Sequence, residues 1–207
     1  MSASSVLFLA KANDSHVERA AEFCRLNFTR VGVYLGKWGD PFPAGAGSSQ
    51  WDCVISYLSR WIISKDLLEA ARIAINFHPG PPEYPGYGCN NFAIYEGARE
   101  YGVTCHHMAP RVDTGAIIEV RRFPVLDSDN AGTLLAKAYG HQLDLYYSMV
   151  GRIIRGEDLP ASREKWTRKP FTRKQFDELG RMTPDMTEQE IARRRRALDV
   201  GALKPAS

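Results

Sequence analysis

The chain has 207 residues, 44% of them hydrophobic and 25% charged, and its formal net charge is +3. The composition is that of an ordinary globular protein, and the length suits one domain with a hydrophobic core of its own and a small appendage. The mild positive charge permits anionic small molecules but does not itself indicate nucleic-acid binding.

The first half of the chain alternates short apolar runs with helical patterns. The run "VLFLA" at residues 6–10 has the continuous apolar character of a buried parallel strand. Apolar residues at helical spacing predict a helix over 15–28, with Ser15 as its N-cap. Strands are also predicted at 30–36, 53–59 and 72–78, with a loop at 37–50 and a helix at 64–71 capped by Ser64. Strands that alternate with helices favour an α/β fold with a parallel sheet.

The second half ends in a segment of different composition. The pattern predicts a helix near 89–100, strands at 102–108 and 116–125, and a long helix over 131–155. From residue 163 the chain is basic with interleaved aromatics, and Thr187 with Glu190 fits a capping box for a final helix. We therefore predict a Rossmann-like, mostly parallel sheet flanked by helices in residues 1–160, and a short basic extension in residues 161–207.

The four cysteines form no CxxC pair and have no dense spacing, so neither a zinc ribbon nor a disulfide framework is indicated. Residues 5–10 are too short for the core of a signal peptide, and no apolar run reaches the roughly 18–20 residues of a membrane span. We expect reduced thiols and a soluble, cytoplasmic protein.

Two polar residues stand at the end of the strand predicted at 72–78. Asn76 and His78 share one face of this strand, about 6.7 Å apart along the backbone. Ligands of open parallel sheets bind at the carboxyl ends of the strands, which is where this pair falls. Seven of the eleven positions from His78 to Gly88 are Pro or Gly, which favours a loop of one fixed shape. Such a loop can wall a pocket with Tyr84 and Tyr87.

A third group comes from the turn after the strand predicted at 102–108, which carries Asp113. An Asn amide can donate to a developing oxyanion, an imidazole can move protons, and an Asp can orient that imidazole. No Ser or Cys stands in an evident nucleophile elbow. The combination favours acyl transfer by direct attack of an amine or water.

The ordered pair "NFHPGPPEYPGYG" and "GVTCHHMAPRVDTGAII" closely resembles the 10-formyltetrahydrofolate-dependent formyltransferase family, over about residues 50 to 125. This family carries an Asn-x-His-Pro strand end and a downstream His-x₆-Asp-[Thr/Gly]-Gly loop. The resemblance implies that Asn76, His78 and Asp113 are catalytic, with Asn76 on the oxyanion and His78 moving the proton. It implies N10-formyltetrahydrofolate as the co-substrate and no metal. The residues implied to bind the folate are Trp61, Ile62, Ile63, Arg111 and Val112.

Within this family, the chain is most like the sugar N-formyltransferases. The segment after 162 is too short for the β-barrel of methionyl-tRNA formyltransferases, and "LAKANDSHVERA" lacks the glycines of a purine-type phosphate loop. The resemblance implies a nucleotide-linked aminosugar as acceptor, such as a 4-amino-4,6-dideoxyhexose (for example perosamine) for a bacterial surface polysaccharide or O-antigen. The residues expected to contact it are Tyr84, Pro85, Gly86, Tyr87, Trp166 and Arg168.

Other interpretations stay open. Asn76 and His78 can serve as a plain strand-end cap, and the histidines at 78, 106 and 107 can suggest a metal site. However, His106 and His107 face opposite ways on a strand, and His106 is better interpreted as a packed histidine, or one that supports the site from behind, than as a second base. A phosphoribosylglycinamide-type enzyme, a formyltetrahydrofolate hydrolase, and a non-catalytic basic module that binds RNA or another polyanion through 163–196 are the alternatives. The C-terminal helix and the tail also offer surfaces for a homodimer.

Overall fold

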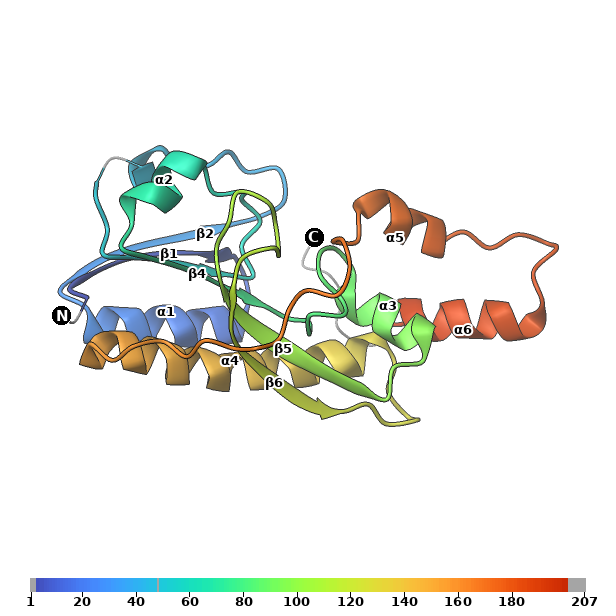
Figure 1. The fold of residues 1–207 in the computed structure, drawn as a ribbon. Helices are drawn as coiled ribbons and strands as arrows, with labels where there is room; N and C mark the ends of the chain where they lie inside the picture. Colours follow the sequence, from blue (N-terminus) through green and yellow to red (C-terminus); the bar gives the residue numbers. More distant parts are fainter. Residues whose placement is uncertain (1–2, 48, 201–207) are drawn as a thin grey trace.

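The computed structural model describes residues 3–47 and 49–200, and a six-stranded sheet forms its centre (Figure 1). Across the sheet the strands lie in the order β2-β1-β3-β4-β5-β6. Their bounds are β1 (Ser5–Lys11), β2 (Arg30–Gly36), β3 (Cys53–Tyr57), β4 (Ile73–His78), β5 (Glu100–His107) and β6 (Ile117–Pro124).

The sheet is mixed. The pairs β1–β2, β1–β3 and β3–β4 are parallel, as the alternation of strands and helices predicted. Beyond β4 the sheet is antiparallel, because β5 pairs antiparallel with β4, and β6 antiparallel with β5. An apolar run identifies a buried strand but carries no information about its direction. The α/β class with a mostly parallel sheet is confirmed.

Helices cover both faces of the sheet (Figure 1). The helices α1 (Ser15–Asn27) and α4 (Ala131–Arg155) lie on one face; the short helix α2 (Lys65–Ala70) and the 3₁₀ turn η1 (Ala44–Gly47) lie on the other. The remaining helices are α3 (Cys89–Glu96), α5 (Arg173–Leu179) and α6 (Glu188–Leu198), and α6 packs against α3. None of the helices in the described part of the chain is long and apolar enough to cross a membrane.

The alternating side chains of β1 divide the core into two layers. Val6 and Phe8 belong to the larger cluster on the side of α1 and α4. Leu7 and Leu9 belong to a smaller cluster that includes Leu67 of α2. A strand that is buried on both faces must be apolar at every position, which explains the uninterrupted run at 6–10.

Capping residues set the ends of the helices. The N-cap of α1 is Asp14 and not Ser15 as predicted, since the Asp14 carboxylate accepts from the N–H groups of His16 and Val17. The predicted helix near 89–100 is shorter, because Gly97, at φ +72°, ends α3 in the left-handed conformation that suits glycine. The predicted bounds of α4 are confirmed.

The C-terminal segment differs most from the prediction. Helix α5 was not predicted; a capping box of Thr172 and Gln175 starts it. Thr187 does cap α6, accepting from the Glu190 N–H. The Glu190 carboxylate, however, binds Tyr95 and two arginines of α6, rather than turning back to complete the predicted box.

Candidate active site

The antiparallel pairing of β4 with β5 assembles the centre of the site. In this register Asn76 stands opposite His106, so a residue from each strand faces the same place. Helix α4 fixes the end of β4 through Gln142, whose Nε2 donates to the Phe77 carbonyl at 2.6 Å. From β5, the Thr104 hydroxyl donates to the Gly80 carbonyl at 2.7 Å and fixes the start of the Pro/Gly loop.

Asp113 enters from the turn between β5 and β6 and links the separate parts of the site. One carboxylate oxygen, Oδ2, accepts from the Gly86 N–H at 2.8 Å and lies 3.2 Å from Nδ1 of His78. The other oxygen, Oδ1, lies 3.3 Å from Nε2 of His106 and 3.5 Å from Nδ2 of Asn76. The structure therefore brings together the Asn, His and Asp that the sequence singled out, and adds His106.

The backbone of Asp113 is in the left-handed region, at φ +48°. Aspartate tolerates this conformation better than most residues, but such a residue persists only where its surroundings determine it. Here the Gly86 amide and two imidazoles hold the side chain. The strained turn thus fixes where the carboxylate points.

His78 uses both ring nitrogens within the protein. Its Nδ1 faces Asp113, and its Nε2 lies 2.9 Å from the Tyr84 carbonyl oxygen. A carbonyl only accepts hydrogen bonds, so Nε2 donates there. Both ring nitrogens are therefore in contact with protein groups, and the proton transfer that the resemblance implies for His78 remains a prediction.

His106 has a different arrangement. Its Nδ1 donates to the His107 carbonyl at 2.8 Å, which leaves Nε2 as the acceptor in the neutral ring. Nε2 lies 3.0 Å from Nδ2 of Asn76 and beside Oδ1 of Asp113. His106 Nε2 and Asp113 Oδ1 are thus the two proton acceptors of the polar cluster formed by Asn76, His78, His106 and Asp113. Because the sequence carried no sign of the register between β4 and β5, His106 was interpreted as a packed or supporting histidine and not as a second base.

The charge of Asp113 follows from its neighbours. Burial by itself would raise the pKa of this carboxyl, but His78, His106 and the Gly86 amide outweigh burial and lower the pKa to about 2. The carboxylate is therefore ionised at neutral pH although it is only 4% exposed.

Two glycines are required by close approaches in the site. A Cβ on Gly115 would lie 1.7 Å from the His107 carbonyl oxygen, and one on Gly86 would lie 2.5 Å from the Phe171 carbonyl oxygen. Gly86 also has φ +86°. These positions explain why the turn after Asp113 reads Thr-Gly and why the loop after His78 ends in several glycines.

The residues predicted to bind the folate have different exposures. Ile62 is 76% exposed and Val112 53% exposed, whereas Ile63 belongs to the smaller core cluster. Arg111 is exposed, and Trp61 packs on the loop at 37–43, its Nε1 donating to the Asp40 carbonyl at 3.0 Å. The exposed apolar side chains stand on the loops that follow β3 and β5.

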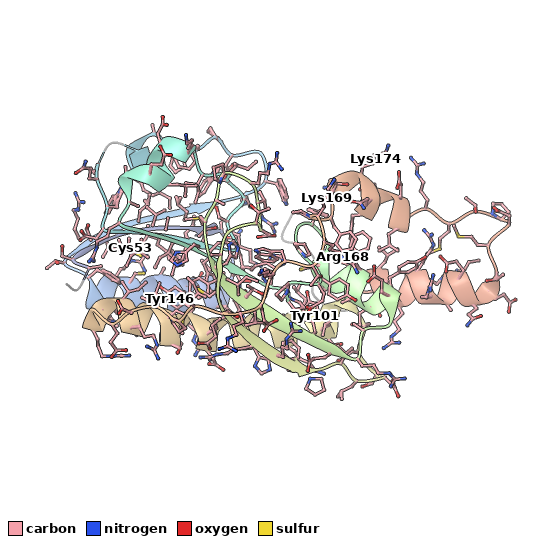
Figure 2. The ribbon with its side chains drawn as sticks, in the orientation of Figure 1. Cys53, Tyr101, Tyr146, Arg168, Lys169 and Lys174 are labelled. Carbon is pink, nitrogen blue, oxygen red and sulfur yellow. The ribbon has the colours of Figure 1, made fainter. Side chains whose placement is uncertain are left out.

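The residues predicted to contact the formyl acceptor differ in burial and in their partners. Tyr84 is buried, and Arg168 pairs with Glu96 at 2.8 Å, so the structure does not bring Arg168 to the cluster. Pro85 is buried, and its carbonyl accepts from Phe171. Trp166 contacts the two imidazoles, with ring centroids 5.0 Å from His106 and 5.9 Å from His78. Figure 2 shows Lys169 just before α5 and Lys174 on α5, apart from the body of the sheet.

Trp38 and Tyr87 form an aromatic pair, of which the sequence indicated only one member. Trp38, which is 63% exposed, lies 6.2 Å from Tyr87 between ring centroids. The Arg60 guanidinium stands 5.2 Å from the Trp38 ring, and the Arg173 guanidinium stands 5.3 Å from the Tyr87 ring. Only Tyr87 had been named from the sequence, since Trp38 lies in a loop without a periodic pattern.

The four arginines at 193–196 bear on the basic-module interpretation. Arg193 and Arg194 pair with Glu190, and Arg194 also donates to three carbonyls at the end of α5 and just beyond it. Arg196 donates to the Asp129 carbonyl at 2.7 Å. Arg194 and Arg196 therefore attach α6 to the rest of the fold, whereas the Arg193–Glu190 pair lies within α6. Within residues 3–47 and 49–200, no group of three or more His, Cys, Asp or Glu side chains is arranged to hold a metal ion.

Comparison with known proteins agrees with this fold. Residues 49–150, which include Asn76, His78, His106 and Asp113, match the formyl transferase family. The resemblance to the formyltransferases is confirmed.

Individual relatives add detail. A methionyl-tRNA formyltransferase of Levilactobacillus brevis is 29% identical over 116 residues, 55% of this chain and 37% of the relative, so this chain spans well under half of that protein. A likely sugar N-formyltransferase of Mycobacterium tuberculosis, Rv3404c, shares the fold with a TM-score of 0.77 at 23% identity, covering 96% of this chain and 88% of that one. An N-formyltransferase of Helicobacter canadensis, crystallised with folinic acid and dTDP-3-aminofucose, has a TM-score of 0.71 at 19% identity, covering 93% of this chain and 80% of that one.

Proposed function

We propose that this protein transfers a formyl group from N10-formyltetrahydrofolate to the amine of a nucleotide-linked aminosugar. The observation that carries the proposal is the convergence of the Asn76 amide, the Asp113 carboxylate and two imidazoles at the end of β4. This set offers an oxyanion donor and proton acceptors around one point.

The chemistry follows from the partners of each group. The acceptor nitrogen attacks the formyl carbon, and the carbonyl oxygen becomes an oxyanion that accepts a hydrogen bond from Asn76 Nδ2. The proton of the amine passes to Asp113 Oδ1 or His106 Nε2, which lie 3.3 Å apart. The C–N10 bond then breaks, its electron pair returns to the folate nitrogen, and that nitrogen takes up a proton. His78, held by Tyr84 and Asp113, lies beside these groups and keeps the Asp113 carboxylate in place.

The exposed apolar side chains suit the folate. Ile62 and Val112 project from the loops after β3 and β5, where a flat pterin ring can cover them and remove apolar surface from water. The Helicobacter canadensis protein that shares this fold was crystallised with a folate, folinic acid. These features support N10-formyltetrahydrofolate as the donor, in a reaction that needs no metal.

The aromatic pair Trp38 and Tyr87 suits the nucleotide of the acceptor. A base can stack on an exposed indole, and the guanidinium groups of Arg60 and Arg173 can pair with phosphate oxygens. The same Helicobacter canadensis protein was crystallised with dTDP-3-aminofucose. An aminosugar destined for a surface polysaccharide or O-antigen and formylated in the cytoplasm is the substrate we propose.

A second candidate acceptor is methionyl-tRNA, because the sequence relatives are methionyl-tRNA formyltransferases. The test is a panel of dTDP-, GDP- and UDP-linked aminosugars and methionyl-tRNA, each mixed with protein and N10-formyltetrahydrofolate. Mass spectrometry of the acceptor detects the added formyl group, and absorbance reports tetrahydrofolate. Formylation of a nucleotide sugar is the expected result. Formylated methionyl-tRNA alone, or formate released equally without any acceptor, would replace the proposal with a tRNA enzyme or a hydrolase.

A further inference from the structure

Trp166 lies outside the two motifs of the site but contacts both. It belongs to the segment that follows α4, and its Nε1 donates to the Gly115 carbonyl at 2.8 Å. Its ring stands at 89° to the His106 ring and at 70° to the His78 ring. One side chain thus touches the turn that carries Asp113 and both imidazoles that surround the Asp113 carboxylate.

The segment around Trp166 is fixed on the Pro/Gly loop. The Thr167 N–H donates to the Pro82 carbonyl at 3.2 Å, and the Phe171 N–H donates to the Pro85 carbonyl at 2.9 Å. The Phe171 ring stacks on Phe92 with centroids 3.8 Å apart. Contacts within the protein therefore fix the backbone on both sides of the indole, and its position does not depend on a bound ligand.

The turn that receives the indole has little freedom. Gly115 passes so close to the His107 carbonyl that even a methyl group would collide with it. The Gly115 carbonyl in turn accepts a hydrogen bond from Nε1 of Trp166. Asp113 stands two residues earlier with its backbone at φ +48°. The hydrogen bond to Trp166 thus holds the strained turn against β5.

From these contacts we propose that Trp166 is a positioning residue for the formyl transfer, acting through His106, His78 and the Asp113 turn rather than by contact with substrate. The kinetic effects expected of Trp166 variants rest on the proposed function, because they are measured as formyl transfer. It replaces the expectation that Trp166 stacks on a nucleotide, since its ring is in contact with the imidazoles. A misplacement of about 1 Å in a catalytic group can reduce the rate by about 10²-fold.

The test compares Trp166→Ala and Trp166→Phe with Lys165→Ala, whose exposed side chain is adjacent on the same segment. Trp166→Ala is expected to lower kcat by about 10²-fold, with the KM for the acceptor within about twofold of wild type. Trp166→Phe keeps an aromatic ring but loses the donor to Gly115, and about a tenfold loss of kcat is expected by the same argument. Lys165→Ala is expected to match wild type. A rise in KM at unchanged kcat would instead identify Trp166 as a nucleotide contact and overturn the inference.

A second measurement does not depend on activity. The chain has five histidines, and the imidazole Cε1–H signals of His78 and His106 can be assigned by NMR. In both Trp166 variants these two signals are expected to move, while those of the distant His16 and His141 stay in place. Unmoved His78 and His106 signals in a folded Trp166→Phe protein would overturn the inference, whichever acceptor is formylated. If Trp166→Ala does not fold, Trp166→Phe alone decides between the two results.

Discussion

Asp113 joins parts of the chain that are far apart in the sequence. Its two oxygens contact the loop after β4 through Gly86 and strand β5 through His106, and both imidazoles of the site point at it. A buried carboxylate is stable only when such partners compensate for its lost hydration. The catalytic geometry and the local stability of the site therefore depend on the same contacts.

Replacement of Asn76 tests the oxyanion donor. Asn76→Ala removes the only amide side chain within hydrogen-bond distance of both His106 and Asp113 among the described residues. Loss of one oxyanion donor typically reduces kcat by about 10²–10³-fold, and that loss is expected in steady-state formyl transfer. Asn27→Ala, at the exposed end of α1, is the control. Near-normal turnover of Asn76→Ala would remove this amide from the mechanism.

Replacement of Asp113 tests the pH dependence of stability. The pKa of this carboxyl falls from 3.8 to about 2 on folding, so the folded state binds fewer protons than the unfolded state between these values. The stabilisation by Asp113 is complete above about pH 4 and is lost as the pH falls toward 2. At 1.36 kcal/mol per pKa unit, it amounts to about 2 kcal/mol.

Asp113→Asn is therefore expected to lower the free energy of unfolding by about 2 kcal/mol at pH 7. The difference from wild type should shrink as the pH falls from 4 to 2, in urea titrations at a series of pH values. Asp144→Asn, an exposed position on α4, is the control. A difference that stays constant down to pH 2 would contradict the role given to this carboxylate.

At the scale of residues, the sequence indicated three of the four polar side chains of the site. It did not indicate His106 or the hydrogen-bond partners of the other three. Asn76 and His78 were identified because polar side chains at a buried strand end are unusual, and Asp113 because of its turn. The acceptor for His78, however, is a backbone carbonyl of Tyr84, and every residue carries one. His106 enters the site only through the β4–β5 register. Such partners depend on tertiary geometry that periodicity does not encode.

At the scale of elements, the turn between β5 and β6 depends on Gly115. Gly115→Ala places a methyl group against the His107 carbonyl, so the turn must move away from β5. We expect a loss of stability of about 1–3 kcal/mol, as for other overpacked sites, together with a strong loss of formyl transfer. Thermal unfolding and initial rates measure the two effects.

The matched control is Gly140→Ala on α4, where an added Cβ meets nothing within 4 Å. Alanine favours a helix interior over glycine by about 1 kcal/mol, so this variant should be slightly more stable and fully active. Equal behaviour of the two alanine variants would mean that the close approach at Gly115 has no consequence.

Elements with a complete local signal were predicted well. The buried strand β1 has a continuous apolar run, and α4 carries its apolar stripe and both caps. Helix α5 was missed because it has only seven residues, of which Leu179 alone is buried, so no periodic face could develop. The direction of β5 was missed because direction is decided by the connection through α3.

At the scale of the whole molecule, the segment after residue 160 packs against α3. Phe171 stacks on Phe92, and Asn91 of α3 donates to the Ala197 carbonyl of α6 at 2.7 Å. The division of the chain near residue 160 remains a prediction. A chain ending at residue 160 would expose the apolar surface that Phe171 and Leu179 now cover.

Deletion of residues 161–207 is therefore expected to destabilise the protein by several kcal/mol, or on the order of 10 °C in Tm. The measurement is thermal unfolding of the full and shortened chains. Lys165→Ala and Lys174→Ala, which remove charge from the same segment without shortening it, serve as controls. A shortened chain with unchanged Tm would mean that residues 161–207 form an independent module.

The parallel bridge between Gly86 and Phe171 has a consequence for synthesis on the ribosome. Every polar group of the cluster has been translated once β6 is complete at Pro124, yet Phe171 is added 47 residues later. At about 5–20 residues per second, this delay lasts several seconds. The nascent chain therefore lacks this bridge during the interval, and the bridge can form only when Phe171 has left the exit tunnel and docked beside Gly86.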